Sequence, residues 1–326
     1  MSIRVQTGDL AVISTPTPFP VGDVNVFLWN GDPLTLIDTG THTEEAWTAL
    51  VAGLRAEGVA VTDLKRVLLT HHHVDHVGLL GRIQDATEVE VYGHPDLAGH
   101  AWLSRQPNAE QDELRRELLA SLGMPQEDVE KGLQLWGRFR DFAAPYRVDR
   151  HFEDGALVGA FTPYFVPGHS ATDTLLANHG SGYSITGDHI LEGINPNPLL
   201  RRATSGKPRP RSLVEYQASL RRSRVLPLGR CYPSHGAVIH DPVPVIDRLL
   251  AYQDKRERRV LEQMPRQGCT PYELSLRLYP KQTLQNFYLC LSVAAGHLEL
   301  LEEKGLAFVG VRAGAVVYYP VEADHA

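Results

Sequence analysis

A short histidine-rich segment carries the strongest chemical signal in this sequence. It reads His71-His72-His73-Val74-Asp75-His76 and follows 66–69, an apolar run that predicts a buried strand. Alternate residues of an extended chain face the same way, so His71 and His73 can converge on one cation while His72 points elsewhere. Asp75 and His76 come where the chain turns into the next helix, which directs them toward a second cation. The spacing therefore predicts two adjacent metal sites.

Three further candidate ligands stand alone, each beside a glycine at the end of an expected strand. They are His169 in Pro167-Gly168-His169-Ser170, Asp188 in Gly187-Asp188-His189 and His235 in Ser234-His235-Gly236. Two ligand sets follow: His71, His73 and His169 for the first ion, and Asp75, His76 and His235 for the second. Asp188 can bridge the two ions. Imidazole and carboxylate ligands favour zinc, with iron and manganese as alternatives.

Two adjacent divalent ions predict hydrolysis. Together they lower the pKa of a shared water, and a bridging hydroxide fits a metal separation of about 3.5–4 Å. Asp75 would orient this hydroxide or carry its proton, and Asp188 would join the ions, so both are expected to be catalytic. The same centre suits an ester, a thioester, a lactone or a phosphodiester, and the substrate class stays open.

The elements around these residues predict an α/β protein with two domains. Short apolar strands alternate with helical segments in the first part, which indicates sheets covered by helices. Residues 95–148 show helical periodicity and few strand signals, so they are interpreted as a helical insert. After about residue 242, three helices and a strand pair follow in the order of a winged helix. The expected domains are a catalytic domain at 1–242 and a winged-helix-like domain at 243–326.

The ligand pattern resembles the metallo-β-lactamase superfamily over about residues 10–240. The HxHxDH motif at 71–76 is followed by His169, Asp188 and His235 in the order of that superfamily. The resemblance implies a four-layered αββα sandwich with the metals at one edge. Leu36-Ile37-Asp38-Thr39-Gly40 is similar to the superfamily's strand-end segment, in which the residue matching Asp38 supports the metal ligands from behind. Segments 251–261 and 295–305 resemble the winged-helix domain of lactamase-like hydrolases that include an endoribonuclease, which adds RNA to the candidate substrates.

The distribution of charge gives a second clue to the substrate. The chain carries a net charge of −7, yet residues 200–230 contain nine basic residues and one acidic residue. This block is either a solvated loop or a rim that binds an anionic substrate through Arg201, Arg202 and Arg209. Residues 243–326 carry ten basic and ten acidic residues, a balance that argues against binding of a nucleic-acid backbone.

Two other classes of function remain open. One is an iron-bearing oxidoreductase of the same superfamily, and the other is a nucleic-acid-binding regulator that uses the winged helix. Cys231, Cys269 and Cys290 are widely spaced and odd in number, which predicts reduced thiols and a cytoplasmic location. The sequence has neither a secretory signal pattern nor a long apolar run, so no membrane association is expected. A homodimer is among the expected states.

Overall fold

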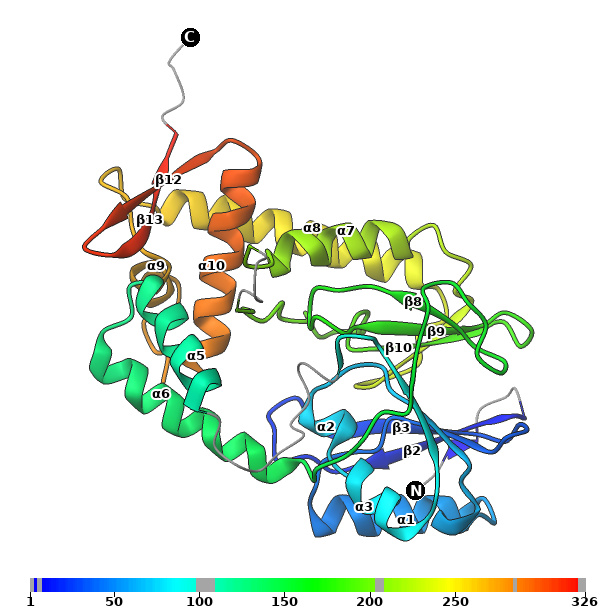
Figure 1. Ribbon diagram of the computed structural model, residues 1–326. Coiled ribbons are helices and arrows are strands. Elements are labelled where there is room, and N and C mark those ends of the chain that lie inside the picture. Colours follow the sequence, from blue (N-terminus) through cyan, green and yellow to red (C-terminus); the bar gives the residue numbers. More distant parts are fainter. Residues whose placement is uncertain (1–2, 5–7, 98–108, 203–207, 284–285, 322–326) are drawn as a thin grey trace. The chain divides into compact units, whose positions relative to one another are not determined.

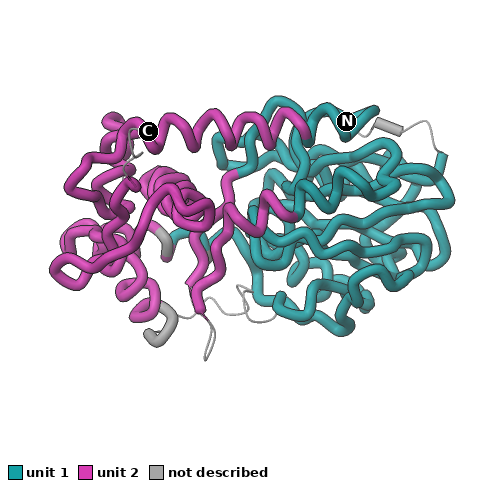
Figure 2. The backbone as a smooth tube through the Cα atoms, turned by 90° about the horizontal axis from the view of Figure 1, so that it is seen from above, with its two compact units in different colours: residues 1–106, 138–196, 219–246 teal, residues 107–137, 197–218, 247–326 magenta. Residues whose placement is uncertain are grey.

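The computed structural model describes residues 3–4, 8–97, 109–202, 208–283 and 286–321. They form two compact units, coloured separately in Figure 2. Unit 1 comprises residues 1–106, 138–196 and 219–246, and unit 2 comprises residues 107–137, 197–218 and 247–326. The helical insert expected at 95–148 includes residues 98–108, which lie outside the described residues.

Unit 1 contains a seven-stranded mixed sheet. Its order is β1-β2-β3-β4-β5-β6-β7, antiparallel from β1 to β4 and parallel from β4 to β7. The strands are β1 Ile3–Arg4, β2 Leu10–Thr15, β3 Val24–Trp29, β4 Thr35–Ile37, β5 Arg66–Leu68, β6 Glu90–Gly93 and β7 Arg150–His151. The parallel half brings the carboxyl ends of β4 and β5 to one edge, which is where Asp38 and the histidine-rich segment begin.

A second, four-stranded mixed sheet has the order β11-β10-β9-β8. Its strands are β8 Thr162–Phe165, β9 Thr174–Asn178, β10 Tyr183–Gly187 and β11 Arg230–Pro233. Because β9 is antiparallel to both β8 and β10, while β11 is parallel to β10, three of the four strands run in one direction. Their carboxyl ends therefore share one edge of the sheet.

The strands of the first sheet bury both faces, because their side chains alternate between two cores. Val26 and Leu28 of β3 join the core beneath helices α1 (Glu44–Ala56) and α3 (Leu80–Ala86), and Figure 1 shows both helices on that side. Phe27, between them, belongs to a second core that includes Ile185 and Tyr232 of the other sheet. The expected α/β architecture is confirmed in this form: two mixed sheets flanked by helices.

Short helical elements lie between the strands of the first sheet. In unit 1 they are α2 (Val74–Val77), which carries two of the expected ligands, and the 3-10 helices η1 (Val61–Asp63) and η2 (Phe139–Phe142). Two longer helices, α7 (Ser212–Ser223) and α8 (Pro242–Gln263), cross the division between the units.

Unit 2 is mainly helical. It holds α5 (Ala109–Ser121), α6 (Gln126–Arg138), α9 (Pro271–Leu278), α10 (Phe287–Glu303) and the hairpin β12 (Ala307–Arg312) to β13 (Ala315–Pro320). Leu119 and Val129 from the two helices of the expected insert pack in one core with Phe287 and Leu291 of α10. Two segments far apart in the sequence thus share a core. The winged-helix assignment of residues 243–326 stays a prediction.

Candidate metal centre

Every expected metal ligand lies just beyond the carboxyl end of a strand. The histidine-rich segment follows β5 of the first sheet, and His169, Asp188 and His235 follow β8, β10 and β11 of the second. Segments at one edge of each sheet therefore supply the whole set, with Asp75 and His76 on α2 and the other ligands in loops. The side chains form two clusters, one of His71, His73, His169 and Asp188 and the other of Asp75, His76 and His235. In each, the ligand atoms lie within 4.8 Å of one another.

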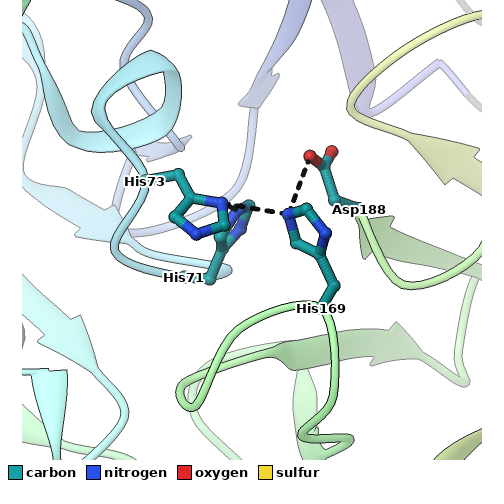
Figure 3. Close-up of side chains that lie close together, drawn as sticks. All are labelled: His71, His73, His169 and Asp188. Atoms are coloured by element: carbon teal, nitrogen blue, oxygen red, sulfur yellow. Dashed lines mark hydrogen bonds and ion pairs between the residues drawn. The ribbon is translucent and has the colours of Figure 1, made fainter. Parts of the chain in front are cut away.

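The first cluster is built from three imidazole rings that point toward one another (Figure 3). His73 Nδ1 lies 3.0 Å from His71 Nε2 and 3.0 Å from His169 Nε2. A carboxylate oxygen of Asp188 lies 3.4 Å from His169 Nε2. Tetrahedral zinc with bonds of about 2.0–2.1 Å separates its nitrogen ligands by roughly 3.3 Å, so this spacing suits a divalent cation.

The second cluster lies next to the first, and Asp188 reaches both. His235 Nε2 is 3.4 Å from Asp75 Oδ2, and His76 Nε2 is 3.8 Å from Asp75 Oδ1. Asp188 is 3.7 Å from His76 Nε2 through one oxygen and 3.7 Å from His235 Nε2 through the other. The carboxylate predicted to bridge two ions thus contacts ligands of both clusters.

Several ligand atoms lack hydrogen bonds although they are buried. Among the described residues, Nε2 of His76, Nε2 of His235 and Oδ1 of Asp188 are in this state. Leaving a buried polar atom without a hydrogen bond costs about 1–3 kcal/mol, so such atoms are rare in folded proteins. Cations at the two clusters would satisfy all three, and the residues present fit a dinuclear metal site.

Hydrogen bonds on the opposite side of each ring fix which nitrogen faces the clusters. His76 Nδ1 lies 2.9 Å from Asp38 Oδ2, and His235 Nδ1 lies 2.8 Å from the carbonyl oxygen of Asp23. Both partners accept, so Nδ1 of each ring keeps a proton and Nε2 is the atom that can bind a cation. His71 Nδ1 is 3.1 Å from Thr70 Oγ1, which leaves its Nε2 for the cluster in the same way.

Asp38 stands behind both clusters. Its carboxylate accepts hydrogen bonds from Thr70 N at 2.8 Å, Thr70 Oγ1 at 2.6 Å and His76 Nδ1 at 2.9 Å. Thr70 Oγ1 in turn contacts His71, so this one buried carboxylate orients a ligand of each cluster. Its backbone adopts φ 58°, a left-handed conformation that aspartate tolerates better than most residues. Sequence reasoning did not single out Thr70, although its place directly before His71 was visible.

The protonation states of His71 and His73 suit metal binding, whereas at His76 a cation would displace a proton from Nε2. Burial lowers the pKa of His71 and of His73 well below the ordinary value, and the neighbouring imidazoles lower it further, so both rings are neutral at neutral pH. Burial also acts on His76, but the carboxylates of Asp75, Asp188 and Asp38 outweigh it and raise the pKa of that ring well above its ordinary value. Against the effect of burial, His76 and its neighbours hold the pKa of Asp188 below its usual range.

Two of the three arginines expected to bind substrate form ion pairs with acidic residues. Arg201 forms an ion pair with Glu215 and donates to Ser212 Oγ at 3.1 Å, and Arg209 forms an ion pair with the buried Glu299. All of these contacts lie within unit 2. Arg202 is half-buried. A substrate-binding role for Arg201, Arg202 and Arg209 stays a prediction. In the part of the chain that the structure describes, no helix combines the length and apolar character needed to span a membrane.

Comparisons with known proteins agree with this geometry. The "Probable metallo-hydrolase YqjP" of Bacillus subtilis (strain 168) is 33% identical over 316 residues, which cover 96% of this chain and 98% of that protein. The crystal structure of the metallo-beta-lactamase family protein TTHA1429 from Thermus thermophilus superposes with a TM-score of 0.81 at 28% identity, covering 96% of this chain and 99% of that one.

An "Atrochrysone carboxyl ACP thioesterase" of Aspergillus fumigatus is 29% identical over 227 residues, which make up 70% of this chain and 40% of that protein. The family model described as the metallo-beta-lactamase superfamily matches residues 19–235, a range that contains all seven residues of the two clusters. This chain therefore belongs to the metallo-beta-lactamase superfamily.

Proposed function

We propose that this metal-dependent hydrolase cleaves a thioester or a related carboxylic ester, with zinc in both clusters. The observation that carries the hydrolytic part is the pair of adjacent clusters linked through Asp188. Their ligands are imidazoles and carboxylates without a thiolate, a donor set that suits zinc and leaves room for a substrate. Iron and manganese remain the alternatives for the metal.

Two divalent cations held there would lower the pKa of a shared water toward neutrality and polarise the carbonyl oxygen of the substrate. Asp75 would orient the attacking water and take its proton at a carboxylate oxygen. Against the effect of burial, His76 and His235 lower the pKa of Asp75, so its carboxylate is ionised at neutral pH. Asp188 would contact both clusters and so fix the distance between them.

Two observations favour an acyl substrate over a phosphodiester. A relative named for the hydrolysis of a thioester on an acyl carrier protein matches 70% of this chain. In addition, Arg201 and Arg209 are already neutralised by Glu215 and Glu299, which reduces the positive charge available to a phosphate backbone. The substrate proposed is a small acyl thioester or ester, and RNA is the competing candidate.

The test begins with the full chain stripped of metal and reloaded separately with zinc, manganese and iron. Each form is assayed against acyl thioesters, carboxylic esters, lactones, phosphodiesters and single-stranded RNA. We expect thioesters to be cleaved fastest, and His71→Ala to lose both metal and activity. His179→Ala is the matched control, because this exposed histidine contacts Tyr164 outside both clusters. Cleavage of RNA or phosphodiesters without thioester hydrolysis would overturn the acyl assignment.

A further inference from the structure

The loop that follows His169 is folded onto a single buried carboxylate. Asp173 is only 3% exposed, and its two oxygens accept from the same residue. Ser170 donates its backbone N–H to Oδ2 at 2.8 Å and its hydroxyl to Oδ1 at 2.5 Å. A carboxylate that receives two such bonds holds a turn more firmly than neutral groups would, because charged acceptors form stronger hydrogen bonds. The position of His169 is therefore set by the residues that directly follow it in the chain.

The same loop is tied to the histidine-rich segment. Thr172 Oγ1 lies 2.9 Å from Nδ1 of His72, and Thr172 N donates to Ser170 Oγ at 3.2 Å. A backbone bond of 2.8 Å from Thr174 N to Thr70 O adds a second link between the two segments. His72, which the spacing assigned no role, lies between two ligands and connects their segment to the loop of the third.

These links matter because the first cluster draws its rings from the same two segments. His71 and His73 come from one and His169 from the other, and the nitrogens that face each other across this junction are 3.0 Å apart. Metal sites lose affinity when ligands shift by about 0.5 Å. Removing a residue that hydrogen-bonds to a ligand and orients it typically weakens metal binding about 10–100-fold. The second cluster is held elsewhere, His235 by the carbonyl of Asp23 and His76 by Asp38.

We propose that Ser170, Thr172 and Asp173, together with His72, form a strap that positions His169 against His71 and His73. The strap sets the affinity of the first cluster for its cation and leaves the second cluster largely unaffected. Its members are positioning residues, since none of them belongs to the two ligand clusters. The proposal depends on the metal centre and not on which bond the enzyme cleaves.

Metal titration tests the strap without any substrate. The full chain is stripped of metal and titrated with zinc against a chromogenic chelator, and then with cobalt(II), whose visible absorption reports the ligand geometry of each ion. Thr172→Val removes the buried hydroxyl and keeps the shape of the side chain. Thr172→Ser keeps the hydroxyl and serves as the matched control. Asp173→Asn replaces one of the two accepting oxygens of the turn.

We expect Thr172→Val and Asp173→Asn to bind one of two zinc ions about 10–100-fold more weakly, with the other ion little changed. The cobalt(II) spectrum should change for the weakened ion alone, and Thr172→Ser should restore the native titration. Equal weakening of both ions, or none in a folded Thr172→Val variant, would overturn the strap. Circular dichroism checks folding. If Asp173→Asn does not fold, the comparison of Thr172→Val with Thr172→Ser tests the proposal on its own. Failure to cleave thioesters would leave these titrations unchanged, so the two proposals fail separately.

Discussion

The buried carboxylate of Asp38 offers a sharp test of how the two clusters are held. Asparagine is the informative replacement, because it keeps the size of the side chain and tolerates the left-handed backbone at φ 58°. It also keeps one oxygen, which can still accept from Thr70 N. The other oxygen becomes an NH₂ group that faces two donors, the Thr70 hydroxyl at 2.6 Å and His76 Nδ1 at 2.9 Å.

The expected loss of metal affinity in Asp38→Asn follows from the positions that the protons must take. If His76 keeps its Nδ1 proton, that N–H faces the N–H groups of the new amide and forms no hydrogen bond with it. If the proton moves to Nε2, it occupies the atom that faces the second cluster. The Thr70 hydroxyl, if it accepts from the new amide, turns its proton toward His71 Nδ1 at 3.1 Å and pushes the proton of that ring to Nε2. Both tautomers oppose ligation. A change of this kind behind the ligands weakens metal binding about 10–100-fold, which is about 1.4–2.8 kcal/mol.

The assay is a zinc titration of the metal-free full chain, with Asp85→Asn as the matched control because that aspartate is exposed on α3. Asp38→Asn should weaken both ions, in contrast to the strap variants, which should weaken one. Native affinity at both clusters, in a variant whose circular dichroism is unchanged, would refute the inference that Asp38 sets the tautomers.

Four further outcomes are expected. His73→Ala should remove the first ion and abolish hydrolysis, as elemental analysis and an activity assay on the same sample would show. Arg209→Ala should lower the free energy of unfolding by about 3–5 kcal/mol, because it leaves the buried carboxylate of Glu299 without its counter-charge. The double variant Arg209→Met with Glu299→Leu should recover most of that lost free energy in denaturant titrations. Burial lowers the pKa of His297 to about 3. Between about pH 6.5 and pH 3 only the unfolded chain protonates this ring, so the free energy of unfolding decreases by about 1.4 kcal/mol for each pH unit of acidification. His297→Gln should flatten that slope. Gly78→Ala should destabilise the fold by about 1–3 kcal/mol in thermal unfolding, since a Cβ there would lie within 2.5 Å of three backbone atoms.

Much of the metal centre could be predicted because its chemistry is concentrated in residue types that rarely cluster by accident. Four candidate ligands fall within six residues, and each of the others follows a strand and adjoins a glycine. The spacing within residues 71–76 separated two pairs of ligands, and the ligand count assigned His169 to one pair and His235 to the other. The supporting carboxylate Asp38 came from the family resemblance, and its contacts with Thr70 and His76 needed coordinates.

Other features could not be predicted from the sequence, because they depend on contacts between distant segments. The partner of His235 is the backbone carbonyl of Asp23, a group that every residue carries and no pattern marks. Counting charges along the chain made residues 200–230 look like a free basic block, yet Arg209 finds its counter-charge at Glu299 on α10. Likewise, helical periodicity predicted α5 and α6 but could not show that they share a core with α10. Long-range partners depend on the tertiary fold, which local patterns do not encode.

The supply of ligands from both sheets has a consequence for how the chain keeps its fold. The first sheet contributes through the loop after β5, and the second contributes through the loops after β8, β10 and β11. An ion held jointly by these segments would act as a cross-link between two layers that otherwise meet mainly through apolar side chains. The unfolded chain has no such preformed site, so by mass action each tenfold rise in free metal above the dissociation constant adds about 1.4 kcal/mol to stability. The availability of metal in the surroundings would thus govern the free energy of unfolding of the enzyme as well as its catalytic activity.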